Sequence, residues 1–313
     1  MKTLYPPLEP YAVHQLEADG HRIYYEECGH PEGIPVLFLH GGPGSGCRPD
    51  HRRFFDPKHY RVILLDQRGC GRSEPVGELR HNDTWKLVED LETVRARLRI
   101  NRWLLFGGSW GAALALLYAQ QHPERSLGLI LRGLFLARQM DLDWFVRDGA
   151  RRIYPDYWHQ LVKSLPVSGW NDLIEGMYKA VTGHNEALQL RVVEAWNRWG
   201  AAVTLGADFD PDALQDPELL LPKTKIELHY AAHRYFVEEN QILRDCHRIR
   251  TLPCIILHGR QDLVCPVETA FSLRRRLPGA RLRILAHAGH IAAGEEMIDA
   301  LVDATDQMAE QLA

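Results

Sequence analysis

Hydrophobic positions along the chain form short, nearly continuous runs that alternate with stretches of helical periodicity. Runs this apolar and rich in branched residues are typical of the central strands of a mostly parallel sheet. We expect such strands at residues 36–40, 61–66, 103–106, 127–132, 254–258 and 281–286. Between them, apolar residues recur at steps of three or four, which predicts a helix with one stripe against the sheet; they are Trp85, Val88, Leu91, Val94 and Leu98.

The two ends of the chain extend this pattern. Residues 11–18 and 21–27 flank Asp19-Gly20, a dipeptide that favours a tight turn, so we expect the chain to open with two antiparallel strands. Residues 111–121 and 295–312 are expected to form further helices. The whole pattern predicts an α/β fold class with a mostly parallel central sheet.

The alternation of strands and helices breaks between residues 134 and 247. This segment is rich in Trp, Tyr and Arg and has no convincing strand, which predicts a helical insertion. It would lie over the carboxyl ends of the strands, where open α/β sheets bind ligands. We therefore expect a core formed by residues 1–133 and 248–313, and a helical cap domain of residues 134–247 that bounds a pocket and excludes water.

The segment Gly107-Gly108-Ser109-Trp110-Gly111 lies between the apolar run 103–106 and the apolar stretch 112–118. A strand, a turn and a helix therefore meet at one serine, which is the context that the G-x-S-x-G nucleophile elbow requires. Glycines on both sides let the strand and the helix approach each other closely. We predict that Ser109 is a nucleophile at the carboxyl edge of the sheet; the alternative is a glycine- and serine-rich turn without function.

A serine hydroxyl becomes a good nucleophile only when a base takes its proton and a third group orients that base. Asp262 follows the run 254–258 and His290 follows the run 281–286, so both are expected on loops at the same sheet edge as Ser109. The chain order Ser109, Asp262, His290 resembles that of the triad in α/β hydrolases. These placements predict a catalytic triad.

Two of these assignments have rivals nearby. His287 lies on the same loop as His290, but it directly abuts the strand, whereas a glycine before His290 gives the backbone freedom to turn. Asp245 and Glu268 are alternatives to Asp262, although the first belongs to the last helix of the expected cap and the second to the helix that follows. We favour His290 and Asp262, with His287 as a structural residue.

The segment His40-Gly41-Gly42-Pro43-Gly44 follows the apolar residues 36–39. This is where such hydrolases place the second amide of the oxyanion hole, so we predict that the backbone N–H groups of Gly42 and Trp110 are the donors. Glycine lets the backbone approach the developing charge, and proline stiffens the loop. A tight turn without function would explain Pro43 but not five constrained residues at this strand end.

Composition and charge exclude several other classes of protein. The net charge is −4 and no long basic block occurs, so we expect no nucleic-acid partner. No window approaches the roughly 20 apolar residues that span a bilayer, and the first residues lack the apolar core of a signal peptide, so we expect a cytoplasmic protein with no membrane partner. The cysteines form no C-x-x-C pair, and His229 and His233 lack a nearby third ligand, so no metal site is predicted.

Five motifs together resemble those of the proline iminopeptidases (prolyl aminopeptidases), a family of the α/β-hydrolase superfamily. They are His40-Gly41-Gly42-Pro43-Gly44, Asp66-Gln67-Arg68-Gly69-Cys70-Gly71-Arg72-Ser73, Gly107-Gly108-Ser109-Trp110-Gly111, Gly259-Arg260-Gln261-Asp262 and Ala288-Gly289-His290. The resemblance covers nearly the whole chain. It implies the α/β-hydrolase fold and a serine peptidase that releases N-terminal proline from small peptides without a cofactor.

One departure from the family concerns the free amino end of the substrate. The resemblance implies two acidic cap residues that hold this end, one after a Trp-x-x-Trp sequence and one in an Ile-Glu-x-His-Tyr sequence. Glu227 supplies the second, but Gly200 stands where the first is expected. We predict that Glu227 binds the substrate and that Glu194 or Asp208 could replace the missing acid; the alternative for Glu227 is an exposed helix glutamate without this role.

The leading hypothesis is acyl transfer to water through a Ser109 acyl-enzyme, with N-terminal prolyl peptides as substrates. A related esterase, lactonase or amidase would keep the triad and use the altered cap for another small acyl substrate, so only the cap distinguishes the two. A non-catalytic receptor would not need a complete triad and oxyanion hole. Haloalkane dehalogenases and epoxide hydrolases need a carboxylate at the elbow, and Ser109 argues against that chemistry.

Overall fold

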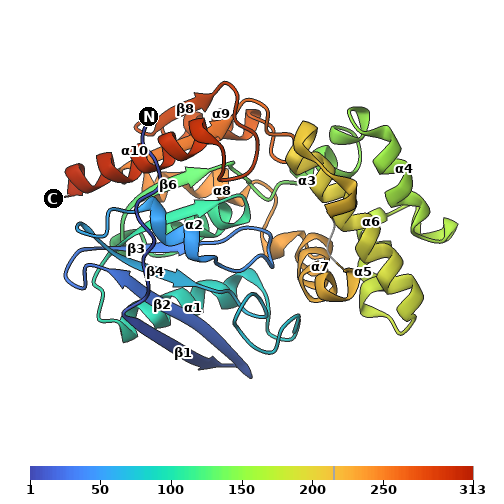
Figure 1. Ribbon diagram of the computed structural model, residues 1–313, viewed down its shortest axis with the longest axis horizontal. Helices are drawn as coiled ribbons and strands as arrows, with labels where there is room; N and C mark the ends of the chain where they lie inside the picture. Colours follow the sequence, from blue (N-terminus) through green and yellow to red (C-terminus); the bar gives the residue numbers. More distant parts are fainter. Residues whose placement is uncertain (214–215, 313) are drawn as a thin grey trace.

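The computed structural model describes residues 1–213 and 216–312, which form one eight-stranded sheet covered by helices (Figure 1). The strands are β1 (Ala12–Ala18), β2 (His21–Gly29), β3 (Ile34–Leu39), β4 (Tyr60–Leu65), β5 (Trp103–Gly108), β6 (Ser126–Arg132), β7 (Cys254–Gly259) and β8 (Arg281–Leu285). Their order is β1-β2-β4-β3-β5-β6-β7-β8, and only the pairs β1–β2 and β2–β4 are antiparallel. All the strands predicted from the sequence are confirmed, and so is the mostly parallel sheet.

Both faces of the sheet are buried, which explains why the central strands are almost continuously apolar. All six residues of β5 are buried, with Trp103 and Leu105 in one core cluster and Leu104 and Phe106 in the other. The helices α1 (Thr84–Arg97), α2 (Trp110–Gln121) and α9 (Glu268–Arg276) contribute to the first cluster, and α10 (Glu295–Leu312) contributes to the second. The helices predicted before β5, after β5 and at the end of the chain are therefore confirmed.

Between β6 and β7 the chain forms helices that extend away from the sheet (Figure 1). They are α3 (Gln139–Val146), α4 (Pro155–Lys163), α5 (Leu173–Thr182), α6 (Glu186–Leu205) and α7 (Pro217–Ala232). The short helix α8 (Gln241–Arg244), which follows them, lies back against α2 and α9. Residues 134–213 and 216–247 contain no strand. Among all the residues described, no helix has both the length and the apolarity needed to cross a bilayer.

Buried charges hold the loop that follows β4. The carboxylate of Asp66 accepts hydrogen bonds from the backbone N–H of Cys47 at 2.6 Å and from the backbone and side chain of Arg72 at 2.9 and 2.8 Å. Arg68, whose side chain is 1% exposed, donates two hydrogen bonds to Asp90 on α1, at 2.6 and 2.7 Å. The loop is therefore tied both to the loop after β3 and to α1.

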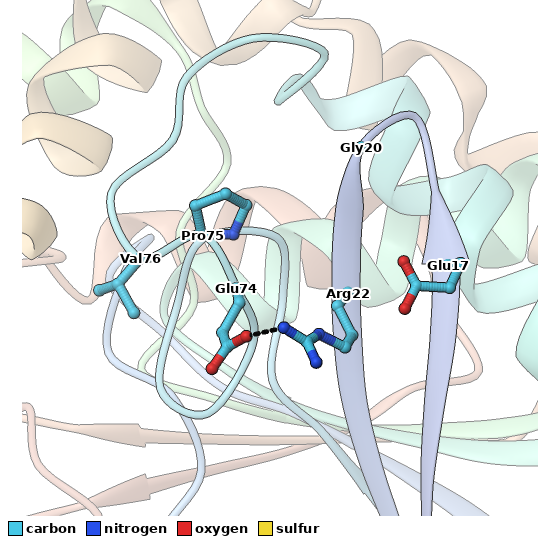
Figure 2. A pocket seen from close by; sticks show the side chains of 6 residues that line it. All are labelled: Glu17, Gly20, Arg22, Glu74, Pro75 and Val76. Atoms are coloured by element: carbon cyan, nitrogen blue, oxygen red, sulfur yellow. Dashed lines mark hydrogen bonds and ion pairs between the residues drawn. The ribbon is translucent and has the colours of Figure 1, made fainter.

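The hairpin of β1 and β2 supports the same loop from a third side. Arg22 and Glu74 exchange two backbone hydrogen bonds, at 2.8 and 2.9 Å, and their side chains form an ion pair. Figure 2 shows this pair at a surface hollow that is also lined by Glu17, Gly20, Pro75 and Val76. None of these residues belongs to the predicted site, so the contact serves to fix the loop.

We expect Asp90→Asn to lower the free energy of unfolding by about 3 kcal/mol, because it leaves the buried Arg68 guanidinium without its carboxylate partner. The loss stays at the lower end of the range for such pairs because Arg68 also donates to Asp19 at 3.0 Å. Urea unfolding followed by circular dichroism measures the change. The matched control is Glu89→Gln on the same helix, whose exposed pair with Lys86 is worth about 0.5 kcal/mol or less. Equal losses in the two variants would contradict this account.

Candidate active site

Ser109 lies at a sharp turn between β5 and α2. Its backbone has φ 56° and ψ −124°, a conformation that costs an L-residue strain energy and persists only where the surroundings enforce it. The Ser109 N–H donates to the carbonyl oxygen of Arg132 on β6 at 2.9 Å, and the Ser109 carbonyl oxygen accepts from Ala112 at 2.9 Å. The strand, the turn and the helix therefore meet at Ser109, in the arrangement that defines a nucleophile elbow.

The glycines around Ser109 are required by close backbone contacts. A Cβ atom at Gly107 would collide with the carbonyl oxygen of Gly111, and one at Gly111 would collide with the carbonyl oxygen of Leu39 on β3. A Cβ atom at Gly108 would collide with the guanidinium group of Arg132. Helix α2 therefore starts directly against the strands, and the backbone contacts at Gly107 and Gly111 leave no room for a side chain there.

Asp262 and His290 lie next to each other at the carboxyl ends of β7 and β8. The distance from His290 Nδ1 to Asp262 Oδ2 is 2.8 Å, and both side chains are buried. The other carboxylate oxygen accepts from the backbone N–H groups of Val264 and Cys265, at 3.0 and 2.8 Å. Burial alone would raise the pKa of the Asp262 carboxyl, but the His290 ring and these hydrogen bonds hold it below its usual value.

Arg132 connects the nucleophile turn with the histidine loop. Its carbonyl oxygen holds the Ser109 N–H, and its guanidinium group donates to the carbonyl oxygen of His290. A Cβ atom at the next residue, Gly133, would lie 3.3 Å from both Asp262 Oδ2 and His290 Nδ1. Ser109 and His290 themselves, both within the described chain, form no direct hydrogen bond; catalytic hydrogen bonds often tighten only when substrate binds.

The rivals considered for the base and the acid have other partners. His287 is exposed, and its backbone N–H donates to Glu296 at 2.8 Å. Asp245 accepts from Arg244 at 3.0 Å, and Glu268 pairs with Arg138 at 2.8 Å. The structure brings Asp262 and His290 together and leaves these three residues with contacts elsewhere.

The predicted oxyanion donors lie on two segments that meet at Ser109. A Cβ atom at Gly41 would lie 3.3 Å from the Cβ atom of Ser109, so the loop after β3 packs against Ser109. Gly42 has φ +112°, a conformation that favours glycine. Trp110 is the first residue of α2, where N–H groups have no acceptor within the helix and lie at the positive end of its dipole. Both segments can present N–H groups to a developing negative charge.

Gln67 joins these two segments, a role that the sequence did not reveal. Its side-chain NH₂ group donates to the carbonyl oxygen of His40 at 3.0 Å, and its side-chain oxygen accepts from the Trp110 indole N–H at 2.9 Å. The backbone N–H of Gln67 also donates to His40 Nε2 at 3.0 Å. All three residues are buried, so one amide side chain sets the spacing between the loop after β3 and the start of α2.

Glu227 lies on α7, the insertion helix that packs against the nucleophile elbow. Tyr230, on the same helix, contacts the Trp110 ring edge-on, with the ring centroids 5.2 Å apart. The Glu227 carboxylate accepts from the Trp196 indole N–H on α6 at 2.9 Å and lies 3.4 Å from the Lys223 ammonium. Glu227 therefore lies about one helical turn before a residue that contacts Trp110.

No other acid among the candidates reaches Glu227. Glu194 pairs with Arg198 at 3.1 Å, and Asp208 is exposed. A Cβ atom at Gly200 would have no atom within 4 Å, so there is open space where the resemblance places an acidic side chain. The structure thus provides one carboxylate at this place, and neither proposed substitute contacts it.

His229 on α7 and His233 directly after this helix are engaged in ordinary packing. His229 contacts the carbonyl oxygen of Asn82 at 2.9 Å and the Tyr178 hydroxyl at 3.3 Å, and the His233 ring stacks on Phe236. Within the described residues, no three His, Cys, Asp or Glu side chains are grouped so that they could hold a metal ion.

The sequence profile of the α/β-hydrolase fold matches residues 34–296, which is most of the chain. Solved structures agree in fold: a carboxylesterase from the thaumarchaeon Nitrososphaera gargenis has a TM-score of 0.65 at 18% identity and covers 96% of this chain and 100% of its own. An esterase from Rhodococcus has a TM-score of 0.60 at 17% identity, covering 98% and 100%. The chain therefore belongs to the α/β hydrolases.

Sequence relatives narrow this class. The chain is 47% identical to a proline iminopeptidase of Xylella fastidiosa over 310 residues, covering 98% of this chain and 99% of the relative. It is 44% identical to one of Xanthomonas citri, covering 99% and 100%, and 40% identical to one of Arabidopsis thaliana, covering 98% and 82%. Within the α/β hydrolases, the chain belongs to the proline iminopeptidase family.

We expect Gln67→Met to lower kcat by about tenfold or more, because the two oxyanion segments lose their common support, whereas removing a donor outright costs a hundredfold or more. KM should change little. Trp110→Phe is the matched variant, since it removes the indole N–H and keeps the backbone N–H. Steady-state kinetics on one ester should show that the double variant Gln67→Met/Trp110→Phe loses no more kcat than the single variant with the larger loss. Losses that multiply would mean that Gln67 acts elsewhere.

Proposed function

We propose that the protein is a serine exopeptidase that releases N-terminal proline from small peptides through an acyl-enzyme on Ser109. The observation that carries the chemistry is the 2.8 Å contact between Asp262 and His290 at the sheet edge where Ser109 forms the elbow. The substrate class is supported by relatives named proline iminopeptidase, which are 40–47% identical over nearly the whole chain.

The proposed reaction uses each group for one task. His290 Nε2 takes the Ser109 proton as the oxygen attacks the prolyl carbonyl, while Asp262 holds the ring through Nδ1 and stabilises its charged form. The N–H groups of Gly42 and Trp110 donate to the oxyanion of the tetrahedral intermediate. His290 then returns the proton to the leaving amine, and water hydrolyses the acyl-enzyme by the same sequence of proton transfers.

The cap supplies the restriction to the first residue of the peptide. Residues 134–247 form the proposed cap domain, and Glu227 pairs with the charged ring nitrogen of the substrate. An α-amino group titrates near about 8 in model compounds and is mostly charged at neutral pH, so its burial requires a nearby carboxylate. A residue inside a peptide has no such charge, which favours cleavage after the first residue only.

For the triad, we expect Ser109→Ala to remove almost all turnover and Asp262→Asn to leave less than about a tenth of the wild-type kcat, because the same change in the triad of a serine protease costs about ten-thousandfold. Asparagine can still accept from Val264 and Cys265, so the loop should keep its shape. The pKa of Asp262 lies below its usual value, so the carboxylate stays ionised across the neutral pH range and Asp262→Asn removes a negative charge throughout that range. More than a tenth of kcat remaining would remove Asp262 from the triad.

For the substrate class, we expect the wild type to hydrolyse L-prolyl-naphthylamide faster than the alanyl and leucyl compounds. Glu227→Gln should lower kcat/KM for the prolyl compound by about a hundredfold, because one partner of a partly buried charge pair is lost. Hydrolysis of p-nitrophenyl acetate, which has no amino group, should hardly change in this variant.

The ester and the amide together separate the possible results. Equal losses on both substrates would make Glu227 a structural residue. If the wild type hydrolyses esters but none of the aminoacyl compounds, the protein is an esterase-like member of the family and the proposed peptidase function is wrong. Ser109→Ala provides the background rate for every substrate.

A further inference from the structure

Both oxygens of the Glu227 carboxylate already have partners within the protein. Oε2 accepts from the Trp196 indole N–H at 2.9 Å, and Oε1 lies 3.4 Å from the Lys223 ammonium. The side chain of Glu227 is 15% exposed, and that of Lys223 is 37% exposed. A cationic ligand that reaches this carboxylate therefore meets an ammonium group that is already there.

The position of Lys223 on α7 holds its side chain near Glu227. Lys223 precedes Glu227 by one helical turn, the spacing at which side chains of opposite charge meet. Its Cγ and carbonyl oxygen would lie 3.2 and 3.1 Å from a Cβ atom at Gly44, in the loop after β3 that carries Gly42. The preceding residue, Pro222, packs as closely on Gly77. The Lys223 side chain thus runs between the oxyanion loop and Glu227.

The charges at this place cancel. Lys223 forms an ion pair with Glu227 alone among the residues described, and the Trp196 indole has no second acidic partner there. Gly200, one turn after Trp196 on α6, contributes no side chain. The Glu227 carboxylate and the Lys223 ammonium together have no net charge. Recognition of a buried cation, in contrast, requires an excess of negative charge.

Given the proposed function, we infer that Lys223 is a specificity-determining residue that competes with the charged nitrogen of the substrate for Glu227 Oε1. Binding of a prolyl substrate must displace or share this ammonium, so like charges repel at the moment when the substrate enters. The consequence is weaker binding of cationic amines than Glu227 alone would give, and weaker discrimination against ligands whose nitrogen carries no charge.

Competitive inhibition by L-prolinol tests this inference. L-prolinol has the charged ring nitrogen but no acyl carbon for Ser109 to attack, so its Ki reports binding without turnover. Lys223→Met should lower this Ki at least about threefold, the scale expected for removing a partly exposed charge next to another charge. Each Ki is measured against hydrolysis of p-nitrophenyl acetate or prolyl-naphthylamide by the same variant, so a change in turnover does not enter.

Matched variants and a matched ligand serve as controls. Lys225→Met removes the same charge two residues along α7, where Lys225 has no ion-pair partner within the described chain, and should leave the Ki unchanged. Lys223→Arg keeps the charge and should retain the wild-type Ki, and Lys223→Gln replaces Lys223→Met if the latter folds poorly. N-acetyl-L-prolinol, which is uncharged, should bind equally to the wild type and to Lys223→Met. Adding Glu227→Gln to Lys223→Met should abolish the gain.

The possible outcomes are distinct. An unchanged Ki in Lys223→Met, an equal fall in Lys225→Met, or no inhibition by L-prolinol in any variant would overturn the inference. A higher Ki in Lys223→Met would also overturn it, because Lys223 would then assist the binding of L-prolinol. The proposed function is tested separately, by cleavage of prolyl-naphthylamide. If the wild type cleaves this compound but the Ki is the same in Lys223→Met, the inference fails and the proposed function stands. If the Ki falls in Lys223→Met but the wild type cleaves only esters, the proposed function fails instead.

Discussion

The close approach of α2 to the sheet is the constraint on which the rest of the site depends. Glycines at 107 and 111 allow helix and strand backbones to touch, and Ser109 has a strained backbone conformation at this contact. Such strain costs about 1–3 kcal/mol and needs rigid surroundings to maintain it. The fully buried strand β5 and the hydrogen bond from Ser109 to Arg132 provide that rigidity. The same turn puts the first N–H groups of α2 beside the nucleophile, so one packing contact positions both.

The loops that complete the site are not held by a strand or a helix. Buried polar groups fix their positions instead. Asp66, Arg68 and Gln67 are consecutive in the loop after β4, and each reaches a different neighbour: the loop after β3, helix α1 and the Trp110 indole. Buried groups of this kind are costly to leave unpaired, so any movement of the loop would break several interactions at once. Rigidity at the loop after β3 thus comes in part from buried residues of the loop after β4.

The sequence predicted the positions that regular structure determines. Strands buried on both faces produce continuous apolar runs, so their ends could be located, and with them Ser109, Asp262 and His290. The bridge made by Gln67 could not be predicted, because it depends on the side-chain directions of three separate loops. The spacing of Lys223 and Glu227 is visible in the sequence. The apolar residues of α7 are, however, spread around the helix and not confined to one face, so the pattern did not indicate which side faces Ser109.

In the proposed mechanism, the core and the proposed cap influence different steps of the reaction. Charge on the carbonyl oxygen appears only as Ser109 attacks, so N–H donors that meet it would stabilise the transition state more than the bound substrate and raise kcat. The charge on the substrate nitrogen is the same before and during acyl transfer, so the proposed contact with Glu227 would stabilise both states equally and act mainly on KM. A lysine beside Glu227 can therefore weaken substrate binding without slowing the chemical step. Substitutions in the proposed cap can then change the affinity for the substrate while the packing that strains Ser109 stays intact.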